Sequence, residues 1–334
     1  MQLMPTPKDT ILREGTASLY HFRRPEGVTP AGGLPLLLVP SMINRWYVLD
    51  LRKGASLADA MVQSGLDTYC LDWGIPEDED RYFTWDMVLA RLGRAVRAVK
   101  RATGAPQVGV LGYCMGATVS GIYTALHPEN VAALANLAGP FDFSKAGFLG
   151  EMVNAKYFDP EAIVAAGNVS PRQMESGFTS MRPTASLAKW INLIDRGSDP
   201  KVRESFLALN AWSGDNIPFP GAAYAVYIRE LYQQNLLVQG KHYVAGQRVD
   251  LGNIRCPVLT VVTDRDTICP PAAAAGLNEH CGSTDKELLT VSGGHVGAVV
   301  GSKASRVLYP AFASFFKKRL AVTSAALLPA TTAS

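Results

Sequence analysis

The sequence predicts an α/β fold in which helices flank a mostly parallel sheet and a mainly helical segment is inserted between two groups of strands. Three observations predict this fold. Short apolar runs alternate with longer helical patterns, one long stretch lacks that alternation, and 48% of the 334 residues are hydrophobic. This length suits one large domain with an insertion, or two ordinary domains, and the composition provides for a substantial buried core.

Six apolar runs are expected to form the strands. These runs are 34–39, 68–71, 108–111, 132–138, 258–262 and 287–291. Short runs bounded by turn residues and followed by helical patterns are typical of buried parallel strands. Residues 85–101 and 302–320 repeat apolar residues at helical spacing and are expected to pack on the sheet. The basic residues of the first helix, among them Arg91 and Arg94, are expected to face solvent rather than a phosphate group.

The long stretch without alternation, residues 142–247, is expected to be a mainly helical cap. It is rich in aromatic residues, which are Phe148, Tyr157, Phe158, Trp190, Phe206, Trp212, Tyr224, Tyr227 and Tyr232. The predicted division is therefore 1–141 and 248–321 for the two parts of the core, 142–247 for the cap, and 322–334 for a mobile tail.

Charge and cysteine usage exclude several kinds of partner. The 32 basic and 29 acidic residues give a net charge of +3, which does not favour nucleic acid. The five cysteines form no C-x-x-C pair, so neither a disulfide framework nor a metal site is expected, and His280-Cys281 is interpreted as structural. Without a secretory signal or a run of about 18 apolar residues, we expect a cytoplasmic protein with no transmembrane segment.

The segment Gly112-Tyr113-Cys114-Met115-Gly116 is the strongest local signal. It directly follows the run QVGVLG and precedes the helical pattern ATVSGIYTALH, which is the context of the nucleophile elbow in an α/β-hydrolase fold. Small residues must flank the nucleophile in so tight a turn, and the helix N-terminus favours a thiolate. The alternative is a small core cysteine in an ordinary strand-to-helix turn. The flanking strand and helix favour the nucleophile.

An acid and a histidine follow Cys114 in the order that this fold requires. The segment TDRDTICP offers Asp264 and Asp266, and His295 lies in the glycine-rich loop SGGHVG. Such a loop buries little, which favours a functional histidine over a packed one. Either aspartate could orient the imidazole while the other caps a turn, and we favour Asp266, in a D-x-x-x-P pattern. The other histidines, including His242 in the cap, have no matching loop.

Two backbone N–H groups are expected to stabilise an oxyanion. The first belongs to Met115, directly after the nucleophile. The second should come from the loop PSMINR after the first apolar run, where we choose Ile43. An ordinary strand-to-helix loop is the alternative interpretation of that segment.

Together these segments resemble the polyhydroxyalkanoate synthases, in particular the short catalytic subunits of the class III and class IV enzymes. The resemblance covers nearly the whole chain. In addition to GYCMGATVS, it rests on TPKDTILREGTASLYHF, PSMINRWYVLDL, LDWGIPEDEDR, ALHPENVAALANLAGPFDF, YIRELYQQNLLVQG, RVDLGNIRCPVLTVVTDRDTICPP and SGGHVGAVVG.

The resemblance implies an acyltransferase that polymerises (R)-3-hydroxyacyl groups from coenzyme A thioesters and releases coenzyme A. Cys114 matches the family nucleophile, Asp266 its acid and His295 its histidine. Coenzyme A enters as part of the substrate, and no cofactor is expected. The implied partners are the polyester chain with its granule surface and a separate second subunit, and we also expect a homo-oligomer.

Two positions depart from the family pattern, and two rival functions remain. Ala117 stands where the family usually has glycine, and Thr267 where it usually has histidine beside the acid. The first rival is a thioesterase or polyester depolymerase that uses the same triad. The second is a catalytically silent granule-surface protein that keeps the fold.

Overall fold

The structure is a computed structural model that describes residues 2–181 and 199–321. Its centre is an eight-stranded sheet with the order β1-β2-β6-β3-β7-β8-β11-β12. The strands are β1 (Lys8–Glu14), β2 (Ala17–Phe22), β3 (Leu36–Val39), β6 (Thr68–Asp72), β7 (Val108–Tyr113), β8 (Val131–Leu137), β11 (Val258–Thr263) and β12 (Lys286–Val291). Neighbouring strands from β6 to β12 pair in parallel. All six predicted strands are therefore confirmed.

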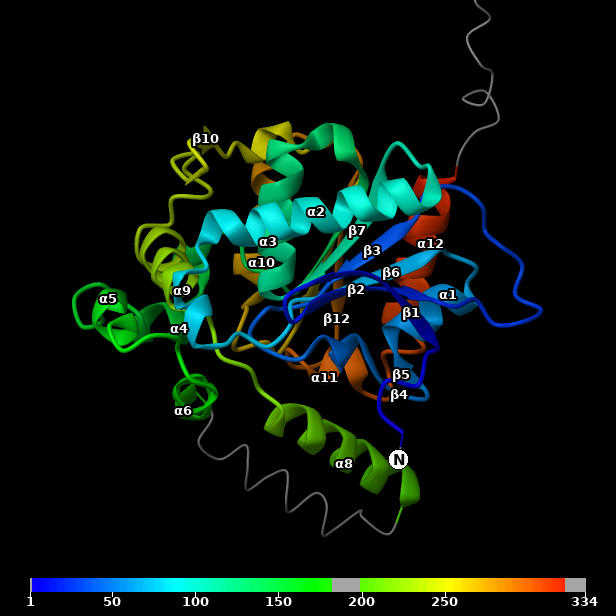
Figure 1. Cartoon of the computed structure of the whole chain (residues 1–334), viewed down its shortest axis with the longest axis horizontal. Helices are drawn as coiled ribbons and strands as arrows, with labels where there is room; N and C mark the ends of the chain where they lie inside the picture. Colours follow the sequence, from blue (N-terminus) through cyan, green and yellow to red (C-terminus); the bar gives the residue numbers. More distant parts are fainter. Residues whose placement is uncertain (1, 182–198, 322–334) are drawn as a thin grey trace, which may run out of the picture.

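Helices cover both faces of this sheet (Figure 1). One face carries α2 (Trp85–Thr103), α3 (Met115–Leu126) and α10 (Pro271–His280), and the other carries α1 (Leu57–Gln63), α11 (Gly297–Val300) and α12 (Leu308–Leu320). The side chains of β3 alternate between the two layers: Leu37 and Val39 pack with the first set, Leu36 and Leu38 with the second. This two-sided burial explains why the central strands are mostly apolar on both faces.

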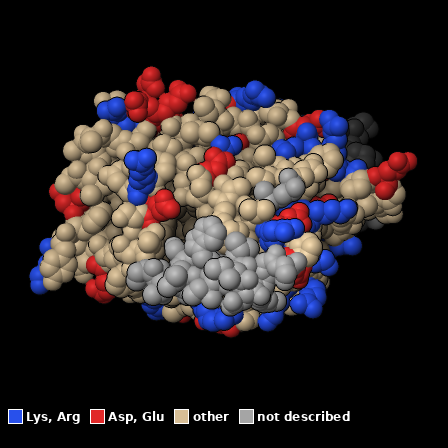
Figure 2. All heavy atoms as spheres, turned by 90° about the horizontal axis from the view of Figure 1, so that it is seen from below, with Lys and Arg blue, Asp and Glu red and all other residues tan. Residues whose placement is uncertain are grey.

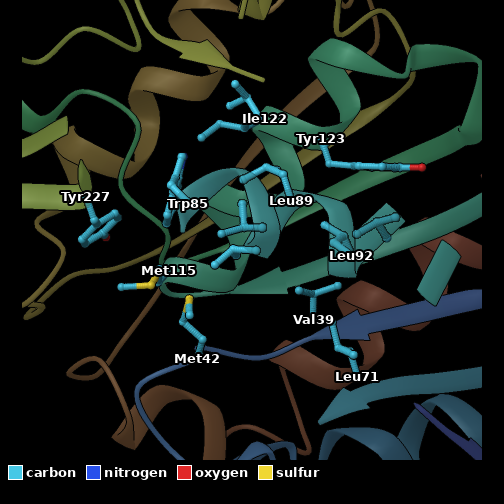
Figure 3. Packing of buried hydrophobic residues seen from close by; sticks show 14 of the residues in the cluster. Val39, Met42, Leu71, Trp85, Leu89, Leu92, Met115, Ile122, Tyr123 and Tyr227 are labelled. Carbon is cyan, nitrogen blue, oxygen red and sulfur yellow. The ribbon is translucent and has the colours of Figure 1, made fainter. Parts of the chain in front are cut away.

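The packing of the first layer is dense around α2 and the loop after β3. Figure 3 shows Trp85, Leu89 and Leu92 of α2 above Val39 and Leu71, while Met42 and Met115 face each other near Tyr227. Residues of the sheet, of α3 and of the inserted region thus share one core.

Two strands of the central sheet and one helix boundary differ from the sequence prediction. The sequence analysis missed β1 and β2, which pair antiparallel at the edge of the sheet. The side chains of β1 are mostly exposed, so no apolar run marks it. The predicted helix 302–320 begins only at Leu308, because turns occupy the preceding residues.

The expected exposure to solvent is wrong for Arg91 of α2, whose side chain is 17% exposed, whereas that of Arg94 is 40% exposed. Both guanidinium groups donate hydrogen bonds to the carboxylate of Glu14, at the end of β1. These two arginines therefore hold the edge strand against α2.

The described residues between β8 and β11 are mainly helical. They form η4 (Phe143–Lys145), α4 (Gly147–Met152), α5 (Pro160–Val164), α6 (Pro171–Met181), α8 (Pro200–Gly214), α9 (Gly221–Val226), the π-helix η5 (Tyr227–Gln233) and a short hairpin of β9 (Tyr243–Val244) and β10 (Gln247–Arg248). Trp190 and the expected tail 322–334 lie outside the described residues. The boundaries of the cap at 142 and 247 stay predictions.

The remaining elements are short. They are η1 (Trp46–Leu49), β4 (Asp50–Arg52), β5 (Ala55–Ser56), η2 (Asp78–Tyr82), η3 (Pro128–Asn130) and η6 (Leu251–Asn253). Among the described helices, none combines the length and apolar character that crossing a bilayer requires. Basic and acidic side chains are interspersed on the face shown in Figure 2.

Candidate active site

Cys114 occupies the turn between β7 and α3 in a strained backbone conformation. Its φ of 55° and ψ of −131° lie where a residue other than glycine is rarely found, and such strain is common at active sites. A Cβ at Gly112 would lie 2.3 Å from the Cα of Ala117, and a Cβ at Gly116 would lie 2.2 Å from the carbonyl oxygen of Val39. Close packing therefore requires both glycines of the motif, as the tight turn predicted from the sequence implies.

Ala117, the first departure from the family pattern, fits beside a glycine. A Cβ at Gly139 would lie 2.4 Å from the Cβ of Ala117, so the methyl group occupies space that Gly139 leaves open. The Gly139 N–H donates to Oδ1 of the buried Asn136 (2.8 Å), whose Nδ2 donates back to the Gly139 carbonyl oxygen (3.1 Å). Sequence analysis missed Asn136, although a polar residue inside an apolar strand was an available signal.

His295 and Asp266 form a buried pair beside Cys114. Nδ1 of His295 lies 2.7 Å from Oδ2 of Asp266, and both side chains are almost fully buried. Nε2 of His295 is also buried, and it makes no hydrogen bond with any of the described residues. Cys114 and His295 line one cavity together. The geometry thus brings together the three residues that the sequence analysis selected.

Asp266 is held by further hydrogen bonds in addition to that with His295. Its Oδ1 accepts from the N–H groups of Ile268 and Cys269, both at 2.9 Å, and its Oδ2 accepts from the Thr263 hydroxyl at 3.0 Å. The exposed Asp264 has another task, because its Oδ1 accepts from the Gly293 N–H at 2.8 Å. Asp264 therefore ties the acid loop to the histidine loop, and Asp266 is the aspartate that contacts the imidazole.

Burial disfavours the charged forms of Asp266 and His295, but their mutual contact favours them. Burial raises the pKa of Asp266, but hydrogen bonds from His295 and the two N–H groups outweigh it, so that the pKa lies below its ordinary value. Burial lowers the pKa of His295, but Cys114 as a thiolate and the Asp266 carboxylate outweigh it, so that the pKa is raised. The raised pKa of His295 favours proton uptake by its imidazole, so His295 is suited to take a proton from Cys114.

Tyr113 supports the imidazole from the side. The two rings stack with centroids 5.3 Å apart and planes 29° from parallel, and the Tyr113 hydroxyl lies 3.4 Å from the His295 carbonyl oxygen. Sequence analysis treated Tyr113 only as a residue of the elbow motif. Its position directly before the nucleophile in that motif was the available signal.

The two expected oxyanion donors lie next to Cys114, and their N–H groups differ in their hydrogen bonding. The Met115 N–H is the first of α3, where the amides have no partner within the helix. The Ile43 N–H points to the Ser41 hydroxyl at 3.4 Å, which is long for a hydrogen bond. Met115 and Ile43 both line a cavity with Cys114. Their roles as oxyanion donors stay predictions.

Cys114 lies where two cavities meet. One cavity, of ≈ 360 Å³, is mainly apolar and is walled by the inserted helices; its aromatic lining is Phe158, Phe178, Phe219, Tyr224, Tyr227 and Tyr232. The other, of ≈ 300 Å³, includes His295, Asn44 and Glu175. The exposed Thr267, the second departure from the family pattern, lines neither cavity, whereas the adjacent Ile268 lines both. A site of this shape can hold an apolar chain beside the thiol.

The end of α8 docks on the loop that carries Ile43. The Trp212 indole N–H donates to the Arg45 carbonyl oxygen (2.9 Å), and Asn44 donates to Asn216 (2.7 Å). Both contacts join segments that are far apart in the sequence. Sequence analysis therefore had no signal for this contact.

Known proteins resemble the chain in sequence and fold. A family described as the alpha/beta hydrolase fold matches residues 35–302. The poly(3-hydroxyalkanoate) polymerase subunit PhaC of Allochromatium vinosum is 32% identical over 94% of this chain and 89% of its own length, and that of Thiocystis violacea is 30% identical over the same shares. A monoglyceride lipase from Saccharomyces cerevisiae has a similar fold, with a TM-score of 0.57 at 14% identity over 96% of this chain and 97% of the lipase.

Proposed function

Because the chain belongs to the poly(3-hydroxyalkanoate) polymerase family and has the α/β-hydrolase fold, it is a polyhydroxyalkanoate synthase, and we propose that Cys114 carries the growing acyl chain. One observation carries this assignment. The buried His295–Asp266 pair, with Nε2 of His295 unbonded among the described residues, lines a cavity together with Cys114. This arrangement is a thiol nucleophile, a general base and an acid that orients the base.

The first half-reaction would load the enzyme from an (R)-3-hydroxyacyl-coenzyme A thioester. Nε2 of His295 takes the proton of the Cys114 thiol, and the thiolate attacks the thioester carbonyl carbon. The Met115 and Ile43 N–H groups would stabilise the oxyanion. When it collapses, the bond to the coenzyme A sulfur breaks, and coenzyme A leaves with the proton from His295. One thioester replaces another, so that the acyl-enzyme retains the energy needed for the next step.

The second half-reaction would transfer this acyl group to a hydroxyl. His295, held by Asp266, removes the proton from the 3-hydroxyl of an acceptor unit, whose oxygen attacks the acyl carbon. An ester bond forms, the bond to Cys114 breaks, and the thiol regains its proton. The apolar cavity beside Cys114 supports transfer over hydrolysis, because its lining excludes water from one side of the acyl group.

Further partners belong to the same proposal. The named relatives are polymerase subunits, which supports a second subunit for this chain. We also place it as a homo-oligomer in the cytoplasm at the polyester granule surface. Light scattering of the purified chain, alone and with a candidate subunit, tests the assembly. A chain that stays monomeric in both samples would contradict it.

The function is tested with (R)-3-hydroxybutyryl-coenzyme A. We expect the wild-type chain to release coenzyme A and to form a precipitable polymer in proportion. Cys114→Ala should give neither product, whereas Cys256→Ala, which removes another partly exposed thiol, should give both. Release of coenzyme A with soluble 3-hydroxybutyrate as the only other product would instead identify a thioesterase.

A further inference from the structure

The apolar cavity beside Cys114 has a π-helix in its wall. The π-helix η5 contributes Tyr227, Ile228 and Tyr232 to the lining. Helices of this type are rare and occur frequently at functional sites. Contacts with other segments hold η5 in place.

His242 provides such a contact from outside the cavity. Its Nδ1 lies 2.9 Å from Oε2 of Glu230, which belongs to η5, and its Nε2 lies 3.1 Å from the indole Nε1 of Trp85. An indole N–H can only donate, so Nε2 must accept, and Nδ1 must carry the proton that is donated to Glu230. The contacts thus fix one neutral tautomer of the imidazole.

The burial of this cluster leaves its polar groups few other partners. His242 is fully buried and Trp85 is 2% exposed, while the side chain of Glu230 is about one quarter exposed. Burial lowers the pKa of His242, which favours the neutral form that the contacts require. Removal of one partner would leave a buried polar group unsatisfied.

The same indole also touches the cavity wall. The rings of Trp85 and Tyr227 have centroids 5.5 Å apart, and Figure 3 shows the two side chains next to each other near Met115. Tyr227 in turn meets Tyr232 with centroids 5.4 Å apart. A continuous set of contacts therefore runs from His242 through Trp85 and Glu230 to the lining of the cavity.

We propose that His242 is a positioning residue which fixes the π-helical wall and so determines how well the cavity accepts the alkyl chain of a 3-hydroxyacyl substrate. This inference rests on the proposed function, in which Cys114 carries the acyl group. His242 lines neither of the two cavities that include Cys114, so it acts through Glu230 and Trp85 and not on the reacting atoms.

The experiment compares coenzyme A release from (R)-3-hydroxybutyryl-, hexanoyl- and octanoyl-coenzyme A substrates. We expect His242→Leu to lower kcat/KM for the octanoyl substrate, relative to the butyryl one, by about tenfold or more, mainly through KM. Alkylation of Cys114 by iodoacetamide, a probe too small to need the wall, should keep its wild-type rate. His242→Gln, which can both donate and accept, should restore most of the chain-length ratio.

Two controls separate this role from a general loss of structure. His280→Leu removes an exposed histidine at the end of α10 and should leave the chain-length ratio unchanged. Glu230→Ala breaks the same contact at a partly exposed position, so it provides the test if His242→Leu does not fold.

The outcomes are distinguishable. A folded His242→Leu or Glu230→Ala variant with wild-type chain-length ratios and KM values would overturn the proposal. Equal losses for all substrates, together with slower alkylation of Cys114, would also overturn it, because His242 would then act on the nucleophile. If the wild-type chain releases no coenzyme A from any of these substrates, either alone or with the candidate second subunit, the proposed function fails first, and the inference fails with it.

Discussion

Two buried histidines of this protein make the same first contact and differ in the second. Nδ1 of His295 meets Asp266 at 2.7 Å, and Nδ1 of His242 meets Glu230 at 2.9 Å. Nε2 of His242 accepts a hydrogen bond from Trp85, whereas Nε2 of His295 has no such bond among the described residues. The second nitrogen therefore distinguishes the two regions.

This difference shows what makes a histidine–carboxylate pair catalytic. A carboxylate orients an imidazole in both regions, but an imidazole can accept a proton from substrate or nucleophile only through an unoccupied nitrogen. Burial lowers the pKa of His242, while the anionic partners of His295, Cys114 and Asp266, outweigh burial and raise its pKa. In our proposals, the His242–Glu230 pair stabilises the wall of the cavity, and the His295–Asp266 pair transfers protons.

The largest expected effect is that of replacing His295, compared with the same replacement at His242. His295→Gln keeps a polar side chain but removes the base, so coenzyme A release from 3-hydroxybutyryl-coenzyme A should fall by on the order of 10³-fold or more. The matched His242→Gln variant should stay within about threefold of wild type, because an amide can replace both contacts. Steady-state release of free thiol measures both. Similar losses in the two variants would refute the distinction.

A second effect tests the carboxylate. Asp266→Asn presents an amide to Nδ1 and favours the wrong tautomer, so kcat should fall by about 10²- to 10⁴-fold. Asp264→Asn removes only a contact to the Gly293 N–H and should cost less than about tenfold. Steady-state kcat for coenzyme A release gives both values. Equal losses would show that the two aspartates share the orienting role.

The sequence contained most of the catalytic region because that region consists of local motifs. The elbow around Cys114 and the loop around His295 are short segments with fixed strand and helix neighbours, so the pattern predicted their positions. Between Asp264 and Asp266 the pattern gave only a preference, since both follow β11 within a few residues. The side-chain directions that separate them appear only in the folded loop.

The wall region was not predictable in the same way. His242, Glu230 and Trp85 come from three separate segments, and no spacing in the sequence indicates that they meet. A π-helix also has no distinct hydrophobic period that would separate it from the α-helix before it. The exposed edge strand β1 was missed for a related reason, because its pattern lacks a buried run.

The smallest expected effect uses the pH dependence of stability, in which the two histidines should differ in sign. His242 has a pKa below the ordinary 6.5 in the folded chain, so its contribution to the free energy of unfolding should be lost as the pH falls below that value. His295 has a raised pKa, so its contribution is complete below pH 6.5 and should be lost as the pH rises toward about 10. Each slope is at most about 1.4 kcal/mol per pH unit for one proton.

Urea unfolding between pH 5 and 10 measures these slopes. His242→Gln should flatten the acidic limb alone, and His295→Gln the alkaline limb alone. Cys114→Ala provides the control, because it removes an interaction that raises the pKa of His295, so the alkaline limb should end at a lower pH while the acidic limb stays unchanged. If the alkaline limb of Cys114→Ala ends at the same pH as that of the wild type, the raised pKa of His295 does not come from Cys114.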